Sequence, residues 1–340
     1  IGAGGGVWPM PKKNEQGEVI RPVELDTTAL DKFIEFHKDF PQLSIFIAFN
    51  QHIELPTYDW FGPVTWMDDE FKAIFREWIG GIIDRFKAGG RDYDEFMIMI
   101  FDETLSPVVA QTCELVHSVD PNVRMKMTMP QATKASVAHV VAAGMNVFNH
   151  HAIRVGYDNA PDGYPILSSG GRELHFYGAA DAAFGSGKER DPLGFFRYLH
   201  WTAFLHGATG VHFWNMLHNN GSSPIWEDES IHNVYWPMVY PLGPGYQDPP
   251  PDVQTAEKVV PSRRWRYVRM GIEDYMLLKM ARERIAERGE RAAVSNCKLD
   301  EILKTVILNR DTDRALFRAK RRELLELVES LGSTDDGVSM

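Results

Sequence analysis

Two adjacent carboxylates, Asp102 and Glu103, follow a continuous run of apolar residues at positions 96–101. A strand that is buried on both faces is continuously apolar and becomes polar where it emerges. Two acids this close repel each other, so one of them tends to keep its proton. The pair therefore suits acid–base chemistry. The other interpretation, which is the more common one for so short a motif, is that the acids cap the next helix.

Glycoside hydrolysis is performed by two carboxylates in three ways. Inverting enzymes hold the two groups far apart with a water between them, and most retaining enzymes hold them about 5 Å apart and use one as a nucleophile. In the substrate-assisted mode, the 2-acetamido oxygen of the sugar attacks the anomeric carbon. One acid then protonates the leaving oxygen and the other stabilises the acetamido group. Adjacent acids suit this third mode, because both tasks are performed at the same carbon.

The elements that must position these acids alternate between strands and helices from about residue 28 onward. The predicted strands cover 43–50, 96–101, 123–129, 145–151, 173–179 and 210–216. Helical patterns fill most of the gaps, which indicates a parallel sheet with helical crossovers. The sheet is either doubly wound or closed into a (β/α)₈ barrel. Polar or aromatic residues end nearly every strand, and all such ends meet at one face of a barrel, so we favour the barrel.

The strand ends supply the candidate substrate-binding residues, which are Asn50, His151, Tyr177, Trp214 and Asn215. Taken singly, Tyr177 and Trp214 are more often core aromatics than sugar platforms. They are candidates for sugar binding because they lie at strand ends.

A second carboxylate that could act as a nucleophile is missing from the later strand ends. Glu173 begins its strand, so we expect it at the opposite face, and Asp158 and Asp162 fall in a loop and stay open. The missing nucleophile favours substrate assistance. A double-displacement β-glycosidase remains the alternative enzyme.

Composition narrows the choice of partners. The formal net charge of −11 argues against nucleic acid, because phosphate binding needs a basic face. No apolar run reaches 18 residues, so we expect no membrane span. His150 and His151 point apart on a strand and lack a third ligand, and the two cysteines are distant, so no metal site is predicted.

The second half of the chain contains a predicted loop at 217–262, rich in Pro, Gly and aromatic residues, and then a charged helical region from residue 265. We expect residues 1–285 to form the barrel and residues 286–340 to form a C-terminal helical extension packed on it.

Several segments together resemble the domain-of-unknown-function 4091 proteins. Residues 261–283, PSRRWRYVRMGIEDYMLLKMARE, resemble the C-terminal signature of that group, and residues 196–216 resemble its Arg…Trp…Gly…Trp helix and strand. The FDE sequence at 101–103 resembles its strand-end acid pair. The group includes glycoside hydrolase family 123, whose members are β-N-acetylgalactosaminidases. The resemblance covers roughly residues 40–330.

This resemblance implies a (β/α)₈ barrel that hydrolyses a carbohydrate by the substrate-assisted, retaining mechanism. It makes Asp102 the stabiliser of the acetamido group and Glu103 the general acid/base, whose pKa the neighbouring Asp102 would raise. It also implies a hydrogen bond from Tyr177 to the acetamido oxygen and a sugar pocket walled by Trp214. No metal or organic cofactor is required, and a periplasmic or extracellular location is implied.

Two features depart from the pattern of that group. Many relatives have Pro directly after the acid pair, whereas this chain reads DETLSP. If the strand at 96–101 is the fourth of the barrel, two strands before residue 43 are largely absent. The chain is then either a fragment or closes the gap irregularly. Because many proteins of the group have no assigned activity, a non-catalytic carbohydrate-binding barrel is the third hypothesis.

Overall fold

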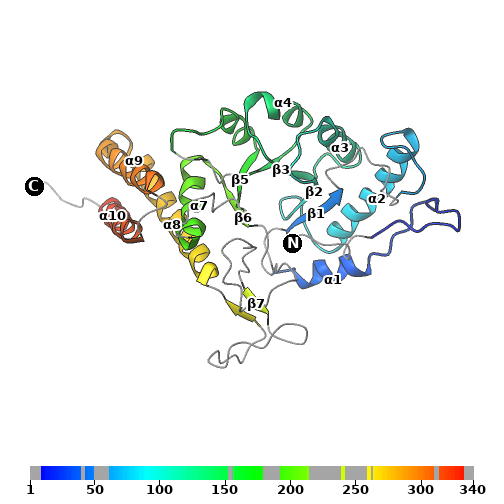
Figure 1. Cartoon of the computed structure of the whole chain (residues 1–340), viewed down its shortest axis with the longest axis horizontal. Helices are drawn as coiled ribbons and strands as arrows, with labels where there is room; N and C mark the ends of the chain where they lie inside the picture. The colour runs from blue at the N-terminus through cyan, green and yellow to red at the C-terminus, as the bar shows by residue number, and fades with distance from the viewer. Residues whose placement is uncertain are drawn as a thin grey trace, which may run out of the picture. The chain divides into compact units, whose positions relative to one another are not determined.

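The computed structural model describes residues 9–39, 43–49, 61–151, 155, 157–178, 192–213, 239–241, 259–261, 263–309 and 314–332 (Figure 1). The chain divides into two compact units. The first consists of Ile1–His150 with Asp162–Glu173, and the second of His151–Pro161 with Leu174–Met340.

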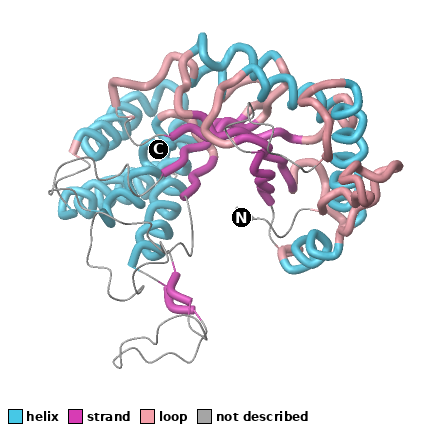
Figure 2. The backbone as a smooth tube through the Cα atoms, turned by 45° about the vertical axis from the view of Figure 1, so that its right-hand side comes forward, coloured by secondary structure: helices cyan, strands magenta, loops and turns pink. Residues whose placement is uncertain are grey.

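The first unit alternates strands with helices. Its elements are α1 (Thr28–Phe36), β1 (Leu43–Phe49), α2 (Asp69–Ala88), β2 (Phe96–Phe101), α3 (Pro107–His117), β3 (Arg124–Met129), α4 (Lys134–Ala142), β4 (Val147–His151) and α5 (Tyr164–Leu167). Strands β1 to β4 pair in chain order, and each pairing is parallel. Helices α2, α3 and α4 lie on one side of these strands (Figures 1 and 2).

Helix α2 shows how the sequence specifies this arrangement. The carboxylate of Asp68 caps the helix by accepting a hydrogen bond from the Phe71 N–H, and acids occupy the first turn where the helix dipole favours them. Its apolar residues recur three and four positions apart, and the helix buries eight of them: Phe71, Ile74, Phe75, Trp78, Ile79, Ile82, Ile83 and Phe86. The Trp78 indole also donates to the Pro9 carbonyl at 2.8 Å, which holds the N-terminal segment on the helix.

Strand β2 is as enclosed as its sequence indicates, and strand β3 is more enclosed than its sequence indicates. All six residues of β2 are buried, as its apolar run predicts. Strand β3 alternates polar and apolar residues, which is typical of one solvated face, yet every residue after Arg124 is buried. The polar residues Lys126 and Thr128 are therefore enclosed beside the end of β2.

The second unit begins with two parallel strands and continues mainly as helices. Its elements are β5 (Glu173–Gly178, whose first residue belongs to the first unit), α7 (Pro192–Leu205), β6 (Gly210–Phe213), β7 (Val239–Pro241), β8 (Val259–Pro261), α8 (Arg263–Arg288), the 3₁₀ helix η2 (Gly289–Ala292), α9 (Ala293–Leu308) and α10 (Arg314–Gly332). Strands β5 and β6 are parallel, and β7 and β8 are antiparallel. The short β7–β8 pair lies within the region predicted as loop.

The prediction of an α/β fold with parallel strands and helical crossovers is confirmed, and the six predicted strands all occur. Within residues 9–39 the structure describes two isolated antiparallel bridges, Pro11–Leu25 and Lys13–Val19, and helix α1. No parallel strand precedes β1 in that segment. The closed eight-stranded barrel and the domain boundary near residue 285 stay predictions.

Helices α7, α8 and α10 meet at one buried carboxylate, that of Asp274. Its oxygens accept hydrogen bonds from Arg197 on α7 (Nη2, 3.0 Å), from the Trp201 indole on α7 (2.9 Å) and from Arg321 on α10 (Nε, 2.9 Å). A Cβ at Gly271 of α8 would meet the His200 ring of α7 at 2.3 Å. Glycine thus permits the close approach of α8 to α7 that this network needs.

We expect Asp274→Ala to lower the free energy of unfolding of the second unit by ~3–5 kcal/mol, because it leaves the buried Arg197 guanidinium without its partner. Denaturant unfolding followed by the tryptophan fluorescence measures this loss. The matched control is Glu273→Gln on the same helix, whose ion pairs are exposed and are worth at most about 1 kcal/mol. Equal losses in the two variants would contradict the central role of Asp274.

Candidate active site

The acid pair lies where β2 ends, in the first unit. Asp102 is partly buried and Glu103 is exposed. The backbone of Glu103 has a φ of 49°, in the left-handed region that residues other than glycine rarely adopt. Such strain costs on the order of 1 kcal/mol and concentrates at functional sites. The chain therefore turns sharply immediately after Asp102, and this turn sets the direction of the Glu103 side chain.

The helix-capping interpretation of the pair does not hold for the next helix. Helix α3 begins at Pro107, and its N-cap residue is Ser106, whose hydroxyl accepts a hydrogen bond from the Val108 N–H at 3.5 Å. Asp102 and Glu103 lie several residues before this cap.

The carboxyl of Asp102 faces polar groups of β3. Burial raises its pKa above the ordinary value, whereas a hydrogen bond with Thr128, the backbone N–H of Glu103 and the charge of Lys126 each lower it. Burial is the largest of these effects. The net effect of these surroundings is a pKa for Asp102 above its ordinary value.

Lys126 is a functional candidate that the sequence reasoning missed. Its side chain is buried, and burial lowers its pKa to about 8, although the charge of Asp102 opposes this effect. A lysine so enclosed is uncommon unless it is paired or functional. The signal in the sequence was a lysine at the centre of an otherwise apolar and threonine-containing strand, RMKMTM.

Polar side chains continue from β3 to β4. Thr128 pairs in register with Asn149, whose amide donates to the Thr128 hydroxyl at 3.4 Å. The Asn149 Oδ1 atom is buried and has no hydrogen-bond partner in the part of the chain that the structure describes. Next to it, His150 Nδ1 lies 2.7 Å from the Tyr164 hydroxyl. This unsatisfied acceptor lies close to Thr128, which also forms a hydrogen bond with Asp102.

Of the predicted substrate-binding residues, the structure describes His151 and Tyr177, both in the second unit. Their rings are in contact, with centroids 5.2 Å apart. On the neighbouring strands, His175 Nδ1 and His212 Nε2 are 2.9 Å apart, a contact that the sequence reasoning did not predict. Asn50, Trp214 and Asn215 lie outside the described residues.

Three other carboxylates were considered as nucleophiles, and each has surroundings that differ from those of the acid pair. They are Glu173, Asp162 and Asp158. Glu173 begins β5, as predicted, and forms an ion pair with Arg124, the first residue of β3. Asp162 accepts a hydrogen bond from the backbone N–H of Lys134 at 2.8 Å, at the start of α4. Asp158 is exposed and belongs to the second unit.

Neither a metal cluster nor a membrane-spanning helix occurs among the described residues. No group of three or more His, Cys, Asp or Glu side chains there is arranged to hold a metal ion. Within the same residues, no helix is both long enough and apolar enough to cross a bilayer.

Comparison with known proteins shows the fold. No family model matches the chain, and no curated protein matches its sequence. A solved family 123 glycoside hydrolase from Clostridium perfringens, described in work on glycolipid glycan hydrolysis, is similar in structure with a TM-score of 0.61. The match covers 91% of this chain and 56% of that one, at 11% sequence identity. The chain thus spans little more than half the length of this protein.

A second solved structure, the family 53 glycoside hydrolase catalytic domain from Ignisphaera aggregans, matches more weakly. Its TM-score is 0.38 and its sequence identity is 13%, over 62% of this chain and 72% of that one.

We expect Lys126→Met to alter how stability depends on pH. Between pH 8 and 10.5 the unfolded chain holds a proton that folded Lys126 has lost, so the free energy of unfolding of the wild type rises with pH across this window. Below pH 8 the full penalty for burying the ammonium group is present. The variant should therefore lose this rise and, at pH 7, be more stable by ~1–3 kcal/mol.

Chemical denaturation at intervals from pH 7 to 10.5 measures the effect. Lys134→Met is the matched control, because Lys134 is exposed and its loss should leave the pH dependence unchanged. A Lys126→Met protein with the pH dependence of the wild type would show that the ammonium group is not buried.

We expect Glu103→Gly to stabilise the first unit by ~0.5–1 kcal/mol, because glycine adopts a positive φ without strain. Glu114→Gly, in the exposed face of α3, should instead destabilise by ~1 kcal/mol. Thermal unfolding of the two variants beside the wild type measures both shifts. Destabilisation of similar size in both would contradict a strained Glu103.

Proposed function

We propose that this chain is a glycoside hydrolase, and specifically a β-N-acetylhexosaminidase of the GalNAc type that uses the substrate-assisted, retaining mechanism. The observation that carries the proposal is the acid pair at the end of β2, with Glu103 exposed in a strained turn and Asp102 partly buried beside Lys126. The fold similarity to a family 123 glycoside hydrolase supports the same class.

In the proposed mechanism, Asp102 receives the acetamido group. As a carboxylate it accepts the acetamido N–H and stabilises the positive charge that develops when the acetamido oxygen attacks the anomeric carbon. Lys126 and Thr128 act on Asp102, since the charge of the first and the hydrogen bond of the second oppose the effect of burial on its pKa. They keep the carboxylate form available in a site that otherwise favours the protonated form.

Glu103 acts as the general acid and then as the general base. It gives its proton to the leaving oxygen while the bond to the anomeric carbon breaks, and it later takes a proton from the water that opens the cyclic intermediate. Its exposure gives it access to substrate and water. The roles that the family resemblance implies for Tyr177 and Trp214 stay predictions.

The test is the hydrolysis of aryl β-GalNAc, β-GlcNAc and β-galactoside by the wild type, Asp102→Asn and Glu103→Gln. We expect turnover of the acetamido sugars alone, and a kcat at least ~10²-fold lower in each variant, because each removes a group that acts in the transition state. Glu114→Gln, an exposed acid on α3, is the matched control and should keep wild-type activity.

The remaining outcomes separate the alternatives. Turnover of the galactoside would overturn the substrate-assisted mechanism and favour a double-displacement enzyme with a separate nucleophile. Binding of an N-acetylhexosamine without turnover, unchanged in Glu103→Gln, would favour the carbohydrate-binding barrel.

A further inference from the structure

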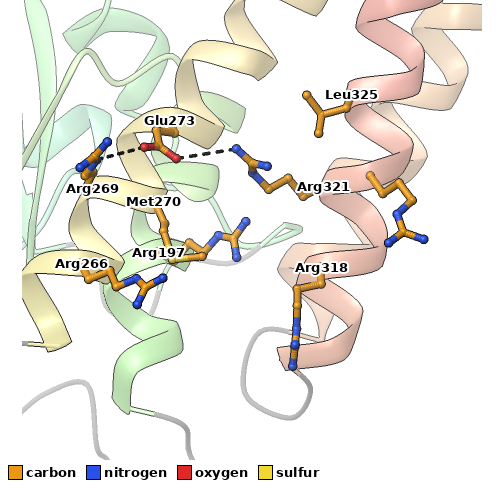
Figure 3. Close-up of a pocket in the computed structure, with 9 residues that line it drawn as sticks. Arg197, Arg266, Arg269, Met270, Glu273, Arg318, Arg321 and Leu325 are labelled. Atoms are coloured by element: carbon orange, nitrogen blue, oxygen red, sulfur yellow. Dashed lines mark hydrogen bonds and ion pairs between the residues drawn. The ribbon is translucent and has the colours of Figure 1, made fainter.

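A pocket of about 620 Å³ lies in the second unit, and arginines dominate its lining, which includes no residue assigned to catalysis. It is formed by α7, α8 and α10 (Figure 3). Six arginines and one glutamate supply all the charges of the lining, in a chain whose overall formal charge is −11. The arginines are Arg197, Arg266, Arg269, Arg318, Arg321 and Arg322.

The two longer helices contribute to the pocket in the same way. Helix α8 supplies residues 266, 269, 270 and 273, and α10 supplies residues 318, 321, 322 and 325. Both sets follow the spacing i, i+3, i+4, i+7, which places them on one face of each helix. Figure 3 shows Arg266 and Arg269 on α8 and Arg318 and Arg321 on α10, with Arg197 of α7 between them. The positive charge is therefore gathered from three helices around one space.

Part of this charge has a structural task. Asp274, which is fully buried behind the lining, holds Arg197 and Arg321. Glu273 lies 3.1 Å from Arg269 and 3.7 Å from Arg321, and both of its ion pairs are partly exposed. Two carboxylates thus serve three of the six arginines, and Arg318 also takes part in an interaction.

Arg266 and Arg322 are left over. Both are exposed, and the structure gives neither of them a hydrogen bond or an ion pair within the residues that it describes. They lie on different helices, so a ligand that binds both must carry acceptors on two sides. Like charges gathered around one space repel each other, and a bound anion removes that repulsion while accepting charge-assisted hydrogen bonds.

We propose that this pocket binds a small polyanion, a ligand with at least two sulfate, phosphate or carboxylate groups. Guanidinium groups match such oxyanions with two parallel hydrogen bonds, which lysine does not provide. The volume lies within the range of ligand pockets, and Met270 and Leu325 add apolar surface for the body of a ligand. A pocket of this size, rather than an extended basic face, favours a small ligand over nucleic acid. This site does not depend on the proposed hydrolysis.

The test is isothermal titration calorimetry at low ionic strength with three probes. They are inorganic phosphate with one oxyanion, citrate with three carboxylates, and a trisulfated uronic-acid disaccharide. We expect citrate and the disaccharide to bind more tightly than phosphate, and the affinity to fall as salt is added. Tighter binding of the disaccharide than of citrate identifies an anionic saccharide as the ligand class, and the reverse identifies a free polycarboxylate.

The double variant Arg266→Gln/Arg322→Gln assigns the binding to the pocket. We expect at least ~10-fold weaker binding, since two charge-assisted hydrogen-bonding groups are lost. The matched control is Arg291→Gln/Lys298→Gln, which removes two exposed positive charges from η2 and α9. We expect the affinity of this control to change less than about 2-fold, because salt screens distant surface charges. Circular dichroism confirms that both variants are folded.

Three results would overturn the proposal. They are no binding of citrate or the disaccharide, equal losses in the two double variants, and tighter binding of a single-stranded oligonucleotide through the same arginines.

Discussion

The burial of one ammonium group, that of Lys126, is the main electrostatic constraint on the candidate site of the first unit. A charge at the centre of a covered parallel sheet is unfavourable unless something nearby compensates it, and Asp102 at the end of the adjacent strand provides that compensation. Burial weakens the charged form of both groups, while each charge favours the other. The two residues therefore form an electrostatically coupled pair. This arrangement is a poor choice for stability alone, and it fits an acid pair that performs chemistry.

In the second unit, a single buried carboxylate, that of Asp274, joins three helices. Asp274 is a single buried carboxylate that binds two arginines and an indole from two other helices, and so it joins α7, α8 and α10. Because one acid satisfies several donors, Arg266 on α8 and Arg322 on α10 are available at the surface of the pocket. The same helices thus combine a structural ion-pair network with a concentration of unneutralised positive charge. The ion-pair network holds the helices together, and these helices carry the arginines that line the pocket.

The strain at Glu103 connects the fold to the proposed chemistry. A left-handed residue two positions after the end of a buried strand turns the chain, with Glu103 exposed and Asp102 partly buried. Two neighbouring acids thereby have different surroundings, which is how one pair of carboxylates can serve two roles. Ser106, rather than either acid, caps α3, so the local structure does not need the pair at this place.

The sequence by itself determined the strands, most helices and the position of the acid pair, because these depend on the periodicity and capping of residues close together in the chain. The burial of Lys126 came only from the tertiary structure, since the alternation in β3 is typical of a strand with one solvated face, whereas the folded strand buries every residue after Arg124. The same holds for Asp274, whose partners lie 77 and 47 residues away. The arginine pocket likewise required two helical faces, each amphipathic in the sequence, to meet. Burial and charge pairing depend on residues that are distant in the chain. The local sequence pattern does not predict which of these residues come into contact.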